Sequence, residues 1–201
     1  MSEDNPIKAI LLGEAGVGKT NLFQLINGGE FENNYNYTLT ALFCQRAICV
    51  NNKDYLFNLW DVPGQEQYRS LNRLYINKCQ LILFIFEINK KKSFNEVDFW
   101  YNLVKEVLGE DGYIIALVGN KADLYKQQEV SDEEIEKKAK ELNVKLKITS
   151  AKNDGEGFKK FFNELLEEYI NTVHSNKIKA SAYKIKEKEK KNSKNKNKCN
   201  N

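Results

Sequence analysis

The sequence predicts an α/β fold, in which a mostly parallel β-sheet carries helices on both faces. Short apolar runs of strand length alternate along the chain with segments whose apolar residues recur at helical spacing. One run, residues 81–86 (LILFIF), is apolar throughout, which is typical of a strand covered on both faces. A glycine-rich turn joins the first apolar run to the first helical segment. Ligands of such sheets bind beyond the carboxyl ends of the strands, so functional residues are expected there.

The first half of the chain predicts three strands and one helix. Residues 7–12 (IKAILL) are short and apolar and end at a glycine, so we expect a buried strand. Residues 20–26 follow the glycine-rich turn as a helix, and residues 27–37 are polar and aromatic without a period, which indicates a loop. Two further strands are expected on either side of a tight turn at Asn-Asn-Lys, at residues 41–50 and 54–60.

The second half continues the alternation after the strand at residues 81–86. Apolar residues at helical spacing predict a helix over 93–108, with Ser93 as its N-cap. Ser131, followed three residues later by Glu134, is a capping box that begins another helix. The remaining predicted elements are buried strands at residues 113–118 and 144–149 and an amphipathic helix at 157–170.

Charge is distributed unevenly along the 201 residues, whose net charge is +3. Residues 177–201 contain ten Lys and two Glu, a local charge of +8, which leaves −5 for the rest of the chain. A segment this charged buries too little apolar surface to offset its ordering entropy, so we expect it to be disordered. The hydrophobic content of 41% suffices for one core. We therefore expect a globular domain over residues 1–172 and a Lys-rich tail over 173–201.

Several classes of protein are not expected. The longest apolar run is too short to cross a bilayer, and the N-terminal residues show no secretory signal pattern. The four cysteines form no C-x-x-C pair, so we expect reduced cytosolic thiols rather than zinc or disulfides. A basic tail on an acidic body favours an anionic partner, either a membrane surface or nucleic acid, over a merely solvated tail.

Residues 13–20 (GEAGVGKT) match the pattern G-x-x-x-x-G-K-[ST] between a predicted strand and a predicted helix. Glycines let backbone N–H groups approach phosphate oxygens, and the start of the helix adds its positive dipole end. Lys19 would reach the outer phosphates, and the Thr20 hydroxyl would bind Mg²⁺. The motif predicts a nucleoside triphosphate site without specifying the base. The phosphate-binding candidates are Gly13, Ala15, Gly16, Val17, Gly18, Lys19 and Thr20.

Two motifs after later strands concern the base. Asn120-Lys121-Ala122-Asp123 places a carboxylate where it can accept from a ring N–H and an exocyclic amine. Guanine offers that pair of donors and adenine does not, so Asp123 favours guanine. The aliphatic stem of Lys121 can lie along the base. Residues 149–152 (TSAK) also follow a predicted strand, and the order and placement of the whole set carry the inference.

A third group of residues concerns magnesium and hydrolysis. Asp61 closes a predicted strand and can hold Mg²⁺ through water. Gly64 offers a backbone N–H to a γ-phosphate, and Gln65 is placed to orient an attacking water. Thr38, in the aperiodic loop, can complete the Mg²⁺ shell and make that loop sensitive to the γ-phosphate.

These motifs, in this order and spacing, resemble those of Ras-superfamily small GTPases and most closely the Rab family. The resemblance covers residues 7–170. Phe31 matches the aromatic residue that stacks on guanine in this superfamily, and Trp60 before Asp61 and residues 83–89 (LFIFEIN) are Rab-type features. By the same resemblance, the second guanine-binding motif is Ser150, Ala151 and Lys152.

The resemblance implies a P-loop NTPase G domain with a six-stranded sheet. It implies a GTP-binding switch that binds GDP or GTP with Mg²⁺, hydrolyses GTP slowly and regulates vesicle traffic. Segments 30–42 and 62–78 would order around the γ-phosphate and relax after hydrolysis. Exchange factors and effectors are implied partners, and an activating protein is implied because no Arg stands where a finger in cis would.

The same resemblance implies geranylgeranylation of Cys199. One lipid anchors weakly, so the Lys-rich stretch would be the second membrane signal. The expected location is cytoplasmic, as a peripheral protein of the cytoplasmic membrane leaflet, with an anionic membrane surface rather than nucleic acid as partner of the tail.

Two departures from the family pattern leave alternatives open. Pro63 replaces the usual Ala between Asp61 and Gly64, and proline removes an N–H beside the peptide that moves on GTP binding. We expect altered hydrolysis or exchange, and a nucleotide-locked scaffold is the alternative function. Residues 40–43 (TALF) also depart, which indicates unusual effector choice. A third hypothesis, an ATP-using kinase or a nucleic-acid factor, conflicts with Asp123.

Overall fold

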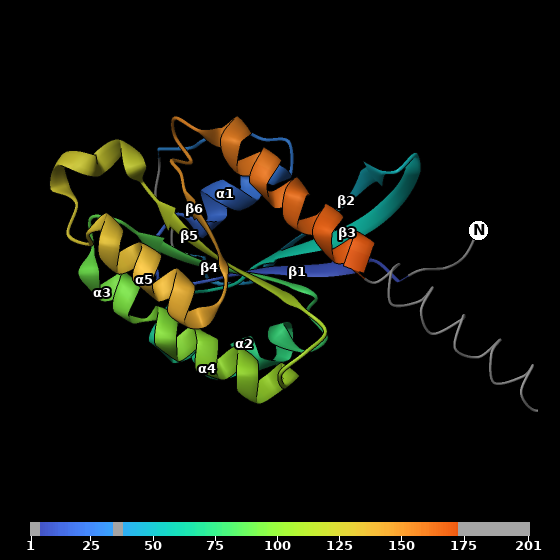
Figure 1. Ribbon diagram of the computed structural model, residues 1–201, viewed down its shortest axis with the longest axis horizontal. Helices are drawn as coiled ribbons and strands as arrows, with labels where there is room; N and C mark the ends of the chain where they lie inside the picture. The colour runs from blue at the N-terminus through green and yellow to red at the C-terminus, as the bar shows by residue number, and fades with distance from the viewer. Residues whose placement is uncertain (1–4, 34–37, 173–201) are drawn as a thin grey trace, which may run out of the picture.

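A computed structural model of the chain describes residues 5–33 and 38–172. Its centre is a six-stranded sheet in the order β2-β3-β1-β4-β5-β6 (Figure 1). β2 pairs antiparallel with β3, and every other neighbouring pair is parallel. This confirms the predicted mostly parallel α/β sheet. The strands are β1 (Ile7–Leu12), β2 (Leu42–Val50), β3 (Lys53–Asp61), β4 (Leu81–Glu87), β5 (Ile114–Asn120) and β6 (Lys145–Ile148).

Helices cover both faces of the sheet, as predicted. One face carries α1 and a C-terminal helix over residues 155–172, and the other carries α2 to α5 (Figure 1). Two short 3₁₀ helices lie in the connections. The helices are α1 (Lys19–Ile26), η1 (Glu66–Tyr68), α2 (Arg69–Ile76), α3 (Lys91–Asn95), α4 (Val97–Leu108), η2 (Ala122–Gln127) and α5 (Asp132–Leu142).

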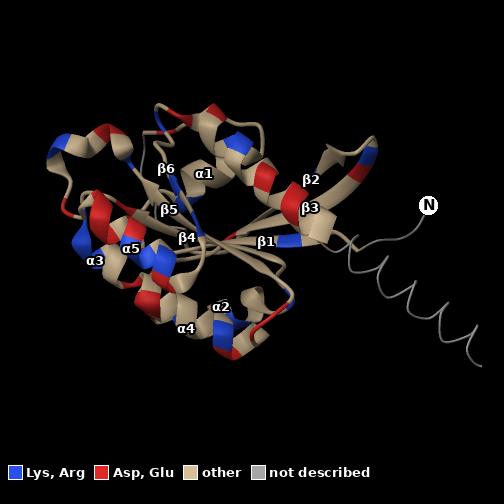
Figure 2. Ribbon diagram, in the orientation of Figure 1, with Lys and Arg blue, Asp and Glu red and all other residues tan. Residues whose placement is uncertain are grey.

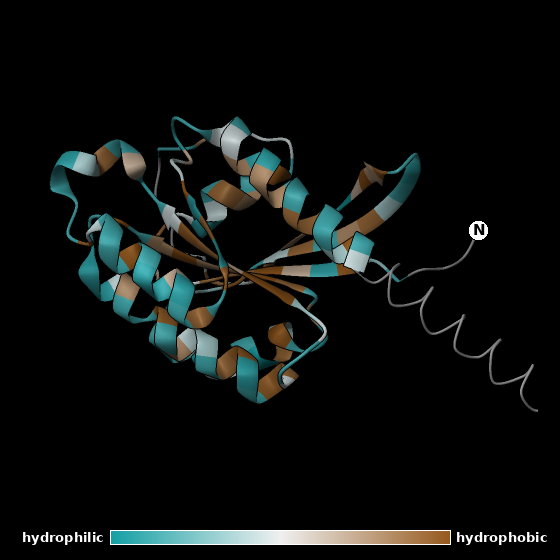
Figure 3. Cartoon of the chain, viewed as in Figure 1, coloured by the Kyte–Doolittle hydropathy of each residue, from teal (hydrophilic) through white to brown (hydrophobic). Residues whose placement is uncertain are grey.

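The central strands are buried on both faces because each face of the sheet has its own core. In β4, Leu83 and Ile85 pack in the cluster under α1 and the C-terminal helix. Phe84 and Phe86 pack in the cluster under α2 to α5. Figure 3 shows the hydrophobic colouring concentrated on these strands and on the inner sides of the helices. A continuous apolar run is therefore what this position in the sheet requires.

The outer surface of α3, α4 and α5 is polar and carries charges of both signs (Figure 2). Some of these charges join neighbouring helices: Lys138 of α5 lies 2.9 Å from an Asp98 oxygen of α4, and Lys91 of α3 pairs with Glu134 of α5. Exposed pairs of this kind add little stability individually. The packed apolar face, rather than the charges, accounts for the position of these helices.

The prediction that Ser93 caps a long helix is wrong. The segment forms two helices, α3 and α4, and Ser93 lies inside the first. Its buried hydroxyl donates to the Lys90 carbonyl at 2.8 Å and accepts from the Glu87 N–H at 3.1 Å. The side chain therefore closes the turn after β4 and is unavailable as a cap. By contrast, the capping box of Ser131 is present as predicted.

Most other differences concern boundaries or missed elements. The strand ends differ from the predicted ones by one or two residues, and the turn at Asn51 and Asn52 is present, with φ of 52° and 59°. η1 and α2 were not predicted. They lie in the segment 62–78, for which the resemblance implies a mobile switch and which was therefore not assigned a helix. The predicted tail and Cys199 lie outside the described residues. Within the described ranges, no helix has the length and hydropathy needed to span a membrane.

Candidate functional site

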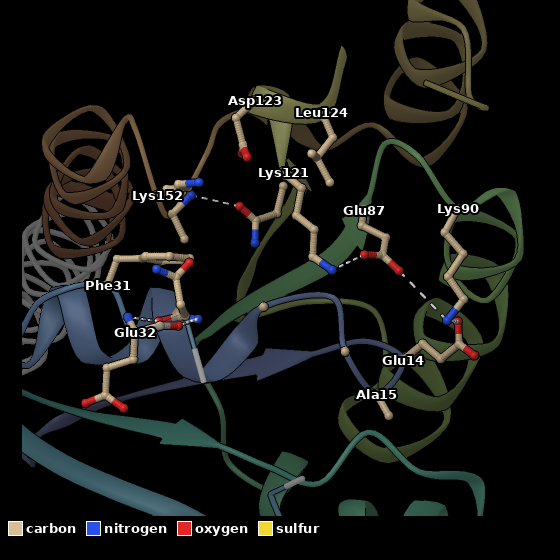
Figure 4. Close-up of a pocket in the computed structure, with 16 residues that line it drawn as sticks. Glu14, Ala15, Phe31, Glu32, Glu87, Lys90, Lys121, Asp123, Leu124 and Lys152 are labelled. Atoms are coloured by element: carbon tan, nitrogen blue, oxygen red, sulfur yellow. Dashed lines mark hydrogen bonds and ion pairs between the residues drawn. The ribbon is translucent and has the colours of Figure 1, made fainter. Parts of the chain in front are cut away.

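The predicted motifs meet at the carboxyl ends of the parallel strands, around a cavity of about 630 Å³. This volume is within the range of small-molecule sites. The cavity is lined by the glycine-rich loop after β1, by residues 31–33, by the end of β4, and by the loops after β5 and β6. In Figure 4, Phe31 and Lys152 lie at one end of the cavity, and Glu14 and Lys90 lie at the other.

The loop between β1 and α1 needs its glycines because other backbone and side-chain atoms approach it closely. A Cβ on Gly13 would lie 2.1 Å from the Ile85 carbonyl oxygen, and one on Gly18 would lie 2.3 Å from Asn120 Nδ2. Gly16 and Gly18 also have φ of 86° and 94°, which L side chains rarely adopt. Gly18 is the N-cap of α1 and offers no side-chain acceptor, and the first turn of α1 has no acidic residue. The helix N-terminus is therefore open to an anion.

Lys19 is buried beneath this loop, where its Nζ donates to the carbonyl oxygens of Gly13 at 3.0 Å and Glu14 at 2.9 Å. Burial lowers the pKa of Lys19 to about 8, and the carboxylates of Asp61 and Glu14 partly offset that shift. An anionic ligand at the loop would favour the charged form. Lys19 is thus a cation held in place for phosphate.

Three oxygen-bearing side chains gather beside Lys19. The Thr20 hydroxyl donates to Asp61 Oδ2 at 2.6 Å, and it lies 2.8 Å from the Thr38 hydroxyl. Asp61 Oδ1 is buried and has no hydrogen-bond partner. Burial raises the pKa of the Asp61 carboxyl, opposed by Lys19 and by the bond from Thr20.

A hard cation suits this arrangement, because it would satisfy the unpaired carboxylate oxygen and prefers oxygen ligands. In residues 5–33 and 38–172 no cluster of three His, Cys, Asp or Glu forms a metal site. Two hydroxyls and one carboxylate with an unpaired oxygen fit Mg²⁺, which usually keeps waters and shares its shell with ligand phosphates.

Asn120 joins three loops at the other end of the site. Its Nδ2 donates to the Val17 carbonyl at 2.8 Å, and its Oδ1 accepts from the Ala151 N–H at 3.0 Å. The side chain is 1% exposed. The sequence predicted Asn120 at the base, and the structure shows it holding the glycine-rich loop to the loop after β6.

Asp123 and Ser150 are paired, although 26 residues separate them in the chain. The Ser150 hydroxyl donates to Asp123 Oδ1 at 2.5 Å and accepts from the Asn153 N–H at 3.1 Å. Ser150 is buried, whereas Asp123 lines the cavity. The pairing orients the carboxylate, so the free lone pairs of Asp123 are available to donors in the cavity.

Phe31, Lys121, Ala151 and Lys152 also line the cavity. Phe31 is half-buried against the core cluster on the α1 side of the sheet. Lys121 adopts a left-handed conformation with φ of 63°, and its Nζ pairs with Glu87 at the end of β4. The pairing holds the aliphatic stem of Lys121 along the cavity wall, and its contact with a base stays a prediction.

Glu14, Glu87, Lys90 and Asn21 line the cavity, but sequence reasoning missed them. Glu14 Oε2 lies 3.3 Å from Lys90 Nζ, which is also 3.8 Å from Glu87 Oε1. Lys90 therefore offsets the charge of two nearly buried carboxylates beside an anion site. The sequence held one signal for Glu87. It is a charged residue directly after the apolar run 81–86, and so it marks the end of a strand at the binding edge.

The segment after β3 packs against the glycine-rich loop. A Cβ on Gly64 would lie 2.4 Å from the Gly13 carbonyl oxygen and 2.5 Å from Lys19 Nζ. Gln65, the predicted catalytic residue, is not among the cavity-lining residues, and its Oε1 accepts from Gln67 Nε2 at 2.9 Å. The structure therefore brings Gly64 to the site and leaves the Gln65 carboxamide turned to its neighbour.

Contacts with α4 and α2 hold this segment. Arg69 donates to Glu96 Oε2 at 2.5 Å, and its guanidinium lies 4.3 Å from the centre of the Phe99 ring. Asn72 of α2 is buried, and its Nδ2 donates to the Pro63 carbonyl at 3.1 Å. Pro63 is thus part of a packed turn rather than a free loop.

Comparison with protein-family models agrees with this geometry. The model of the Ras family matches residues 8–171, which span the six strands except for Ile7 and include every cavity motif described above. A nucleotide-sized cavity at the strand ends, a glycine-rich anion loop and a hard-cation site are what this family uses as a GTP-binding switch. The chain belongs to the Ras family of small GTPases.

Proposed function

We propose that this protein is a Rab-type switch that binds GDP or GTP with Mg²⁺ in the cavity and hydrolyses GTP slowly. The observation that carries the proposal is the Asp123 carboxylate, which is oriented by Ser150 and faces the cavity. A fixed acceptor of this kind suits the ring N–H and amine of guanine. It would leave an unpaired, desolvated carboxylate opposite adenine.

The other site residues have the roles that their positions support. Lys19 and the backbone N–H groups of the loop bind the phosphates, with Gly64 on the γ-phosphate side. Thr20 and Thr38 would hold Mg²⁺ directly and Asp61 would hold it through water, and the ion would neutralise charge on the phosphates. The base would be held by Phe31, Lys121, Asp123, Ala151 and Lys152, with Asn120 and Ser150 fixing the loops of the base site. The phosphates would be held by Gly13, Ala15, Gly16, Val17, Gly18 and Lys19.

Slow hydrolysis is supported by the positions of Gln65 and the arginines. Gln65 must leave Gln67 to orient a water at the γ-phosphate. The chain has three arginines, and each is engaged away from the cavity: Arg46 with the Asn27 carbonyl, Arg69 with Glu96 and Arg73 with Glu106. An activating protein that supplies a cation and repositions Gln65 would provide what the chain lacks.

An apolar surface beside the switch segments supports a role as a regulator that binds partners. Phe43 is 49% exposed, and its ring lies 4.9 Å from that of Trp60, which lies 5.4 Å from that of Tyr75. Leu71 and Leu74 of α2 are also exposed. Solvent-exposed apolar patches of this kind mark interaction sites. Because the patch joins β2, β3 and α2, a partner that binds it would sense the state of the segment around Gly64.

A role in membrane traffic rests on the tail. We propose that Cys199 is prenylated and that the Lys-rich stretch binds anionic lipid headgroups of the cytoplasmic leaflet, since one lipid alone anchors weakly. Replacing Cys199 with Ser should move the protein from the membrane to the soluble fraction of cells. Unchanged fractionation of the Cys199→Ser variant would contradict prenylation as the anchor.

A nucleotide-locked scaffold is the second candidate, because Pro63 is buried and its carbonyl accepts a hydrogen bond from Asn72. This contact could hold the peptide next to Gly64 in one position. The two candidates differ in turnover rather than in binding, so a hydrolysis assay separates them.

The first experiment identifies the nucleotide and its fate. Protein purified with Mg²⁺ is denatured, the released nucleotide is identified by chromatography, and phosphate release is followed after loading with GTP. Guanine nucleotide with turnover that falls at least tenfold in Gln65→Ala, but not in the neighbouring control Gln67→Ala, supports the switch. GTP that persists for days supports the scaffold, and adenine nucleotide or none would contradict guanine binding.

A further inference from the structure

Asn21 of α1 makes a two-point contact with the loop that carries Phe31. Its Nδ2 donates to the Glu32 carbonyl at 3.1 Å, and its Oδ1 accepts from the Glu32 N–H at 2.8 Å. Both polar groups of one peptide-like amide thus pair with both backbone groups of Glu32. Only Asn or Gln offers a donor and an acceptor in this arrangement, and Gln has a longer stem.

The contact lies where the loop reaches the cavity. The start of the loop is held to the end of α1, where the Gly29 N–H donates to the Gln24 carbonyl at 2.8 Å. Residues 29–33 have no regular secondary structure, so their path depends on contacts such as that of Glu32. Asn21, Phe31 and Glu32 all line the cavity. In Figure 4, Phe31 and Glu32 stand together on this side of the cavity.

We propose that Asn21 is a positioning residue that keeps Phe31 at the cavity wall and so sets how long a guanine nucleotide remains bound. The inference rests on the proposed function, in which Phe31 stacks on the base. A ring that is already ordered loses no further conformational entropy when the base binds, whereas a ring on a loose loop does. An ordered loop raises affinity mainly by slowing dissociation. A loop that is held less firmly opens more often and releases the ligand sooner.

The test measures dissociation of a fluorescent GDP analogue with Mg²⁺ from the full chain. Asn21→Ala is expected to release it about 5- to 150-fold faster, from a factor of about 2 to 12 for each hydrogen bond lost. Gln24→Ala is the matched control, since Gln24 lies one turn along the same helix and is not among the residues that line the cavity. Its hydrogen bond to Gly29 uses the backbone carbonyl, which alanine retains. It should release the nucleotide at the rate of the unsubstituted protein.

A double-variant cycle distinguishes positioning from general loosening of the helix. If Asn21 acts through Phe31, then Asn21→Ala should have little further effect in a chain that already carries Phe31→Ala. If the rate increases of the two single variants multiply in the double variant, the proposal is overturned, because Asn21 then acts independently of the ring. A general loss of stability would give this multiplied increase in the release rate.

The outcomes also separate this inference from the proposed function. If Phe31→Ala speeds release and Asn21→Ala behaves like Gln24→Ala, Asn21 has no positioning role and guanine binding stands. If Phe31→Ala leaves the rate unchanged, the stacking role of Phe31 and the proposal for Asn21 fail together. Absence of any binding of the GDP analogue to the unsubstituted chain would overturn the proposed function itself.

Discussion

The side chain of Asn120 joins the glycine-rich loop to the loop after β6, and its removal should lower the free energy of unfolding by an amount that can be calculated. In Asn120→Ala, the Val17 carbonyl and the Ala151 N–H both lose their partner. Both residues are buried, at 0% and 5% exposure. A buried backbone group left unpaired costs about 1–3 kcal/mol. The variant should therefore be destabilised by about 2–6 kcal/mol in total.

Thermal unfolding followed by circular dichroism measures this loss. In a chain of this length each kcal/mol lowers Tm by about 2–4 °C, so a fall of about 4–24 °C is expected. The assay uses nucleotide-stripped protein, because a bound ligand adds stability of its own. Asn58→Ala is the matched control, since Asn58 Oδ1 accepts an exposed hydrogen bond from Gln45 at 2.9 Å. It should change stability by no more than about 0.5 kcal/mol. Equal Tm values for the two variants would refute the reasoning.

Three further predictions concern the phosphate side of the site. Lys19, with its pKa at about 8, should become fully charged when phosphate binds, so nucleotide binding at pH 8.5 should take up protons and affinity should fall as pH rises above 8. Calorimetry in buffers of different ionisation enthalpy measures this proton uptake, which should vanish in Lys19→Arg. Gly64→Ala should slow GTP hydrolysis at least tenfold, because its Cβ would clash with the Gly13 carbonyl and Lys19; an unchanged single-turnover rate would contradict this packing. Pro63→Ala should alter hydrolysis or nucleotide exchange, and if stopped-flow assays show neither rate changed, Pro63 has no part in switching.

The sequence by itself determined the elements whose cause is local. The apolar run of β4, the strand that ends before Gly13 and the capping box at Ser131 all follow from neighbouring residues, and all are present in the structure. The motif residues also sit at strand ends as predicted, because parallel strands bring their carboxyl ends to one edge. Fold class and the general location of the site therefore needed no tertiary information.

Only the tertiary structure decided what holds the site residues in place. Ser93 closes a turn because it is buried beside Glu87, which its sequence neighbours do not reveal. Asn120 contacts Val17 across more than a hundred residues of chain, and Ser150 orients Asp123 from the loop after β6. Which of these hydrogen bonds form depends on which polar groups the fold buries beside one another, because buried polar groups need partners. Sequence patterns carry the residue types, whereas the pairing of those residues depends on long-range packing.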